Sequence, residues 1–171
     1  ALTGSTRKLF SVGLALNTLG ANRRQSTQVF RQGTVTGGVL NGNLVLVGGG
    51  DLSFGGRRLS PDTIQFTNFD HNDANGLGTA ILTPQDPLTG LDQLAASIKA
   101  AGITSITGEI AVDDRLFEAF RVPNGNLLIT PMMLNENQID VSVTPTAVGG
   151  PATVEVRPTT GFFSVTANVT T

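Results

Sequence analysis

The amino-acid sequence lacks several residue types that commonly carry chemistry. The 171 residues include no cysteine, which excludes disulfides, thiol catalysis and cysteine-ligated metals and is compatible with cytoplasm or periplasm. Tryptophan and tyrosine are also absent, so nine phenylalanines are the only large aromatic side chains, and no stacking platform for bases or sugars is evident. A formal charge of −2 with dispersed arginines gives no basic footprint for nucleic acid.

Long apolar runs and a leader peptide are missing too. No stretch reaches the roughly eighteen apolar residues that a membrane-spanning helix needs. No charged region followed by an apolar leader core is present either. Because the chain starts almost at the motif described below, without an initiator methionine, we expect a mature or truncated form. The missing leader therefore does not argue for a cytoplasmic location.

The residues that are present indicate an ordered globular chain. Hydrophobic residues make up 39% of the sequence, charged residues 14%, and glycine is plentiful at 21, a composition that leans toward β-structure. A helix that is apolar almost all round is predicted over residues 5–19. A second, amphipathic helix is predicted over 90–101, with Gly102 as its stop.

Strand patterns account for most of the other segments. Residues 39–47 predict a hairpin, because Asn41-Gly42 can supply the two positive φ angles of a type I′ turn. Residues 103–112 read as strand, turn and strand, and apolar–polar alternation predicts strand over most of 137–171. The predicted fold class is α+β and β-rich.

Ser5 and Lys8 stand three residues apart at the start of the first predicted helix. At this spacing the two side chains share one helix face, where the lysine amine can reach the serine hydroxyl and take its proton. This is the S-x-x-K pair of penicillin-binding proteins and serine β-lactamases. An N-cap serine followed by a surface lysine gives the same spacing, so the surroundings have to separate the two interpretations.

Those surroundings favour a nucleophile. From Leu9 to Leu19 the helix is apolar on nearly every side, which is typical of a helix enclosed by a larger domain. Its first turn is polar instead. The helix therefore presents its N-terminus, with free backbone N–H groups and the positive end of its dipole, at a surface or cleft. A solvated surface helix would not need an apolar body combined with a polar first turn.

Four segments carry a resemblance to a known family. They are residues 1–10, ALTGSTRKLF, which hold the serine and lysine; 40–51, LNGNLVLVGGGD; 101–110, AGITSITGEI, followed by Asp113-Asp114; and 130–137, TPMMLNEN. Together they resemble the class C low-molecular-mass penicillin-binding proteins, the D-alanyl-D-alanine carboxypeptidase/endopeptidase family. The similarity covers nearly the whole chain. The first segment is the catalytic one, and the other three are scaffold.

The resemblance implies a serine-type hydrolase of the bacterial cell wall, located in the periplasm or otherwise outside the cytoplasm. Ser5 would attack the carbonyl of the penultimate D-Ala of a peptidoglycan stem peptide, and its backbone N–H would be an oxyanion donor. Lys8 would be the general base, which requires a neutral amine. β-Lactam antibiotics would be covalent inhibitors. No cofactor, metal or nucleic acid is implied.

Two further motifs of the family, S-x-N and K-T-G, are absent. No serine is followed two residues later by Asn, and the nearest approach to K-T-G is Thr159-Thr160-Gly161. In the family these motifs follow a long insertion after the first helix. We therefore expect residues 1–25 to be the nucleophile-helix part of a transpeptidase-like domain. Residues 26–171 would be an inserted β-rich region of one or two subdomains, divided near 88–115 and truncated at its C-terminus.

This division has a functional consequence. The remaining part of the transpeptidase-like domain becomes an expected partner of the chain, and the 171 residues alone are expected to be inactive.

Three other motifs have weaker chemical interpretations. The triple glycine Gly48-Gly49-Gly50 lacks the helix and lysine of a phosphate-binding loop. Residues 70–75 meet a calcium-loop pattern only in part, which favours a polar loop within the long irregular stretch 53–87, rimming a cleft. Asp113-Asp114 would point to opposite faces of a strand, which favours a turn or salt-bridge role over paired acid–base catalysis.

Two other classes of function stay open. One is a non-catalytic, β-rich module that binds cell-wall peptide, in which Ser5 and Lys8 are incidental. The other is a β-lactamase-like hydrolase, which shares the pair but turns over the drug. Covalent labelling of Ser5 by penicillin would exclude the non-catalytic module. Slow release of the acyl group would argue against the β-lactamase-like hydrolase.

Overall fold

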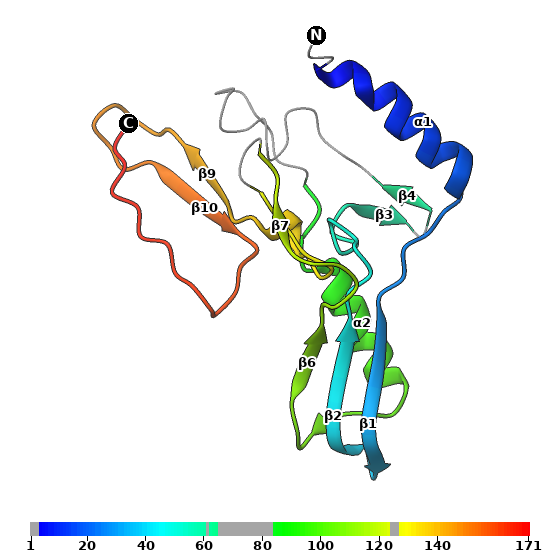
Figure 1. Cartoon of the computed structure of the whole chain (residues 1–171). Helices are drawn as coiled ribbons and strands as arrows, with labels where there is room; N and C mark the ends of the chain where they lie inside the picture. Colours follow the sequence, from blue (N-terminus) through cyan, green and yellow to red (C-terminus); the bar gives the residue numbers. More distant parts are fainter. Residues whose placement is uncertain (1–3, 61, 65–83, 124–126) are drawn as a thin grey trace.

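The computed structural model describes residues 4–60, 62–64, 84–123 and 127–171 (Figure 1). Within these ranges strands predominate and two α-helices are present, so the predicted α+β, β-rich class is confirmed. In chain order the elements are η1 (Gly4–Arg7), α1 (Lys8–Leu19), β1 (Gln28–Thr36), β2 (Val39–Val47), β3 (Arg58–Ser60), β4 (Thr63–Ile64), α2 (Thr89–Ala100), β5 (Ser105–Ile106), β6 (Ile110–Asp113), β7 (Phe120–Arg121), β8 (Leu128–Ile129), η3 (Asn135–Asn137), β9 (Asp140–Thr144) and β10 (Thr153–Arg157).

The largest sheet is organised around β2. On one edge β1 pairs with it antiparallel, from Gln28 opposite Val47 to Thr36 opposite Val39. On the other edge β5 and β6 both run parallel to it, β5 near its start and β6 near its end. Parallel neighbours need a crossover connection, and α2 lies within it. Figure 1 shows α2 alongside this sheet.

The core lies between this sheet and α2. Leu40 and Leu44 of β2 are buried together with Ile103, and Ile98 of α2 packs against them. Val29, Val35 and Ile106 complete this cluster from the neighbouring strands. The amphipathic helix predicted over 90–101 is thus confirmed, and it stops before Gly102, whose φ of 86° is one that glycine adopts without strain.

The predicted hairpin over 39–47 is wrong. These residues form one continuous strand, β2, and the chain turns before it at Gly37-Gly38, with φ angles of 56° and 82°. Two consecutive glycines meet the type I′ requirement at no steric cost, whereas asparagine in the first position costs more. Gly42 instead pairs with Gly33 on β1, where the two backbones approach too closely for a Cβ on either residue.

The first helix is shorter than predicted and is exposed. η1 occupies the first turn, so the α-helix begins at Lys8. None of its residues is buried: Leu9 is 75% exposed and Phe10 78%. In Figure 1 α1 projects away from the main sheet. Burial of this helix by the described residues is therefore ruled out, and its apolar side chains stay exposed.

The surface area of the chain exceeds that of a compact protein of the same mass. The accessible surface is 12032 Å². A compact monomer of the same mass would expose about 7,900 Å². Fully buried large side chains are correspondingly few among the described residues, namely Leu40, Pro131 and Met133. The chain as it stands leaves apolar faces without cover.

The C-terminal third contains less strand than predicted. β9 pairs with β10 antiparallel, with Val141 opposite Val156 and Val143 opposite Val154, so these alternating runs are confirmed. Residues 158–169 form no regular ladder. Pro158 has no N–H to donate to one, and only the end of the segment returns, where the Ala152 N–H donates to the Val169 carbonyl at 2.9 Å.

Candidate active site

Ser5 and Lys8 lie on adjacent turns at the start of the first helix. Ser5 is in η1 and Lys8 is the first residue of α1. A 3₁₀-helix has three residues per turn, so side chains three apart eclipse one another, more closely than they do in an α-helix. Gly4, with a φ of 52°, directs the chain into this turn. Side chains at this spacing are therefore expected to share one face.

The described residues leave this pair open to solvent. Both side chains are exposed, and neither forms a side-chain hydrogen bond within the described part of the chain. No acidic residue lies in the first turn of η1 or α1, and Arg7 stands between the two. Nearby, the Ser11 hydroxyl donates to the carbonyls of Arg7 and Lys8 at 3.4 Å each. The described residues therefore do not bury Lys8, the proposed base.

The segment nearest to K-T-G does not substitute for that motif. Thr159, Thr160 and Gly161 follow β10 and are not part of a strand. The Thr159 hydroxyl bonds back to the Val156 carbonyl at 3.3 Å, and the Thr160 hydroxyl accepts from the Phe162 N–H at 3.3 Å. Their polar groups are used locally. In Figure 1 this region lies across the molecule from α1.

The triple glycine allows close packing of neighbouring backbone segments. The Gly48 N–H donates to the Asp113 carbonyl at 2.8 Å and the Gly50 N–H to the Pro131 carbonyl at 2.7 Å, so neither is available to a phosphate. A Cβ on Gly48 would come within 2.6 Å of the Pro131 carbonyl carbon. These contacts connect the three segments that carry the scaffold part of the family resemblance, namely 40–51, 101–110 with Asp113-Asp114, and 130–137.

One member of the acidic pair, Asp113, forms a salt bridge, which agrees with the predicted turn or salt-bridge role. Asp113 ends β6, and its carboxylate is 2.6 Å from the Arg115 guanidinium. Hydrogen bonds from the Arg115 side chain, and secondarily its backbone N–H, lower the pKa of Asp113 to about 2. A carboxyl group held in this ionised state is not poised to donate a proton near neutrality.

Several other expectations concern metals and membranes. The stretch 70–75 lies outside the described residues. Among those that are described, no group of three or more His, Cys, Asp or Glu side chains gathers to hold a metal ion. Within the same ranges no helix has both the length and the apolar character needed to cross a bilayer.

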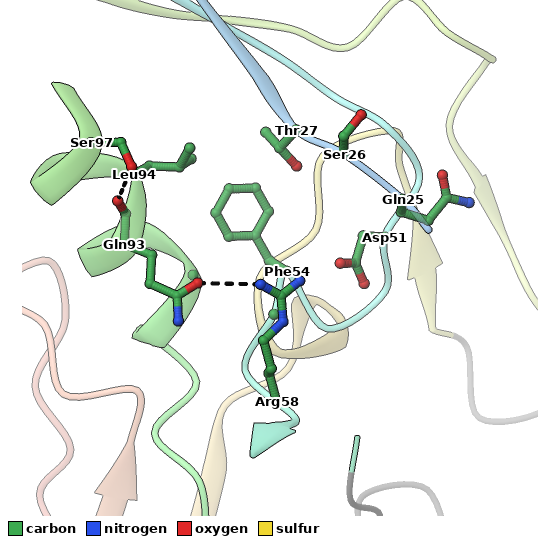
Figure 2. A pocket seen from close by; sticks show the side chains of 11 residues that line it. Gln25, Ser26, Thr27, Asp51, Phe54, Arg58, Gln93, Leu94 and Ser97 are labelled. Carbon is green, nitrogen blue, oxygen red and sulfur yellow. Dashed lines mark hydrogen bonds between the residues drawn. The ribbon is translucent and has the colours of Figure 1, made fainter. Parts of the chain in front are cut away.

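The structure reveals a pocket that the sequence did not indicate. It has a volume of about 300 Å³ and lies between α2, residues 25–27 and the loop after β2. Figure 2 shows Arg58 and Gln93 joined by a hydrogen bond at its side, with the Phe54 ring beside them. No motif marks this site, because its residues come from three segments that meet only after folding.

The family comparison defines the class of protein. A family model described as D-Ala-D-Ala carboxypeptidase 3 (S13) matches residues 1–171. The chain belongs to this family of D-Ala-D-Ala carboxypeptidases. The predicted membership of a carboxypeptidase family is thereby confirmed, and the family is one of peptidases whose substrates are related to peptidoglycan. No curated protein matches the chain significantly.

Proposed function

We propose that the complete protein is a serine-type, penicillin-binding carboxypeptidase or endopeptidase of the class C type, acting on peptidoglycan stem peptides outside the cytoplasm. One observation carries this proposal. In a chain of the D-Ala-D-Ala carboxypeptidase family, Ser5 and Lys8 share a face of the turn that opens an apolar helix. This is the spacing that a serine nucleophile and its lysine base require.

The proposed reaction passes through an acyl-serine. Lys8, neutral, accepts the Ser5 proton while the serine oxygen bonds to the carbonyl carbon of the penultimate D-Ala. The C–N bond to the terminal D-Ala then breaks, and Lys8 returns the proton to the leaving amine. Water attacks the ester in the same manner and restores the Ser5 hydroxyl. In an endopeptidase the broken bond is a cross-link to a D-centre.

The oxyanion in this reaction needs donors. The first backbone N–H groups of a helix have no partner within it. Ser5 lies in the first turn of η1, so its N–H is suited to donate to the developing negative charge. The positive end of the helix dipole adds to this stabilisation.

The proposal assigns the missing chemistry to further polypeptide. Residues 1–25 would belong to a transpeptidase-like domain whose remaining part covers α1, shelters Lys8 and supplies the S-x-N and K-T-G groups. Residues 26–171 would form an inserted β-rich region. The exposed apolar side chains of α1 support this division. The 171 residues alone should then neither bind penicillin covalently nor release D-Ala.

Labelling of the complete protein with fluorescent penicillin tests the proposal. Wild type should form a stable adduct on Ser5, identified by peptide mass. Ser5→Ala should form none, because the hydroxyl that makes the ester is gone. Thr6→Ala is the matched control, since its hydroxyl is one position along and faces elsewhere, and it should label normally. Absence of an adduct in wild type would favour a non-catalytic module, and rapid release would favour a β-lactamase-like hydrolase.

A further inference from the structure

Two arginine pairs that are distant in sequence meet at one pocket. Arg23-Arg24 follow α1, and Arg57-Arg58 lie at the start of β3. Together they line a pocket of about 160 Å³, here called the arginine pocket, with two carboxylates, Asp51 and Asp62. Four of the nine arginines in a chain of net charge −2 thus gather at one place.

The carboxylates of the described residues do not balance these charges. Arg24 is 2.9 Å from Asp62, and buried Arg57 is 3.5 Å from Glu136. Asp51 accepts hydrogen bonds from the Ser53 N–H at 3.0 Å and its hydroxyl at 3.2 Å, and so shapes the loop.

The other two arginines remain available. Among the residues that the structure describes, Arg58 bonds only to a neutral group, the Gln93 amide oxygen, at 3.4 Å. Arg23 forms no ion pair within the described ranges. These two guanidinium groups are exposed, so each is free to bind an anion.

The pocket between α2 and residues 25–27, which adjoins the arginine pocket, indicates which class of anion fits here. It shares Gln25, Asp51, Gly55 and Arg58 with the arginine pocket. Its walls add the polar side chains of Thr27, Gln93 and Ser97 beside the Phe54 ring (Figure 2). Amide and hydroxyl groups next to guanidinium forks suit a peptide backbone with carboxylate side groups better than an isolated small anion.

We propose that the two pockets form one binding site for an acidic peptide segment, with Arg23 and Arg58 binding its carboxylates. The inference rests on the proposed function, because it identifies this peptide as part of the peptidoglycan substrate. The site lies beyond the far end of α1 from Ser5. A helix of twelve residues spans about 18 Å. The site therefore holds the polymer at a distance from the bond that is cut.

Binding of the complete protein to insoluble peptidoglycan tests this site without using activity. Arg23→Gln with Arg58→Gln should weaken binding about tenfold, since a hydrogen bond to a charged group contributes that much or more. Neither change touches the buried Arg57–Glu136 pair. Arg31→Gln with Arg115→Gln removes the same charge away from both pockets and should leave binding unchanged. Equal losses in both double variants, or in neither, would overturn the proposal.

Soluble probes identify the ligand chemistry. Tetraglutamate should displace the wild-type protein from peptidoglycan, whereas tetraglutamine should not. Displacement by inorganic phosphate as effective as that by tetraglutamate would overturn the assignment to a carboxylate peptide. Penicillin labelling of Ser5 should be the same in wild type and both double variants. A wild type that binds peptidoglycan through these arginines but forms no adduct would overturn the proposed function and leave the site standing.

Discussion

The two α-helices are equal in length and opposite in their surroundings. α1 and α2 have twelve residues each. Ile98 of α2 packs against the buried leucines of β2, whereas α1 exposes apolar side chains along its whole length. Apolar content alone therefore does not decide burial. A helix is covered only where a complementary face exists, and the described residues provide one for α2 and none for α1.

The largest expected effect is on the rate of penicillin acylation, and it is tested by replacing the two lysines, one on each helix. In the complete protein, Lys8→Arg should slow penicillin acylation about 10²–10⁴-fold, because a guanidinium stays protonated and cannot accept the Ser5 proton. Lys99→Arg keeps a cation in the last turn of α2 and should have no effect. The labelling rate with fluorescent penicillin measures both. Wild-type acylation by Lys8→Arg would exclude the lysine as the base.

A pair of leucine truncations tests the burial difference itself. In the 171-residue chain, Leu40→Ala beneath α2 should lower the free energy of unfolding by about 2–5 kcal/mol, because it leaves a cavity. Leu14→Ala on α1 should cost less than about 0.5 kcal/mol, since this side chain is exposed. Urea unfolding gives both values.

The same truncations separate two explanations of the exposed helix. In the complete protein Leu14→Ala should cost about 2–5 kcal/mol, as expected for a buried leucine. A cost that stays below about 0.5 kcal/mol there would mean that α1 remains uncovered, and the proposed enclosing domain would be wrong.

A smaller effect is expected from dye binding. The 171-residue chain should bind a hydrophobic fluorescent dye through α1, and Leu9→Gln with Phe10→Gln should reduce the fluorescence. Ala95→Gln with Ala96→Gln on the exposed face of α2 is the control and should change nothing. If the dye signal survives loss of the α1 side chains, another surface is the main exposed apolar patch.

The smallest expected effect is on the pKa of Asp113, at the end of β6 in the sheet that α2 covers. The pKa of Asp113, about 2, lies below its unfolded value of about 3.9. Its ionised form therefore stabilises the fold above pH 4, and this contribution is lost as the pH falls toward 2. Arg115→Gln should raise the pKa toward 3.9. NMR titration of the 171-residue chain measures it, and a wild-type value near 3.9 would show that the hydrogen bonds between Asp113 and Arg115 do not persist in solution.

The sequence predicted those features that depend on local pattern. The stripe through Leu94 and Ile98 placed α2 correctly, because one neighbouring sheet satisfies a single apolar face. The turn in the first sheet was misplaced, because Asn41-Gly42 and Gly37-Gly38 both meet the local requirement. Pairing along the whole length of β1 and β2 decided between them, and that is a property of two segments together.

The candidate site divides in the same way. Ser5 and Lys8 are neighbours in sequence, so their spacing alone predicted a shared face. The arginine pocket could not be predicted, since Arg23 and Arg58 approach each other only through the loops that flank the main sheet. The role of the triple glycine could not be predicted either, because the group that leaves no room for a side chain on Gly48 is the carbonyl of Pro131, which is distant in sequence.

The parallel pairing of β2 with β5 and β6 has a consequence for the order in which the chain folds during synthesis. The β1–β2 hairpin can form as soon as it leaves the ribosome, but Leu40 and Leu44 then face water. Their cover arrives with Ile98 and Ile103, and Thr104 bonds back to Gly38 across 66 residues. Closing such a long loop is slow. Until then the nascent hairpin carries an uncovered apolar face, the state in which a growing chain most needs a chaperone.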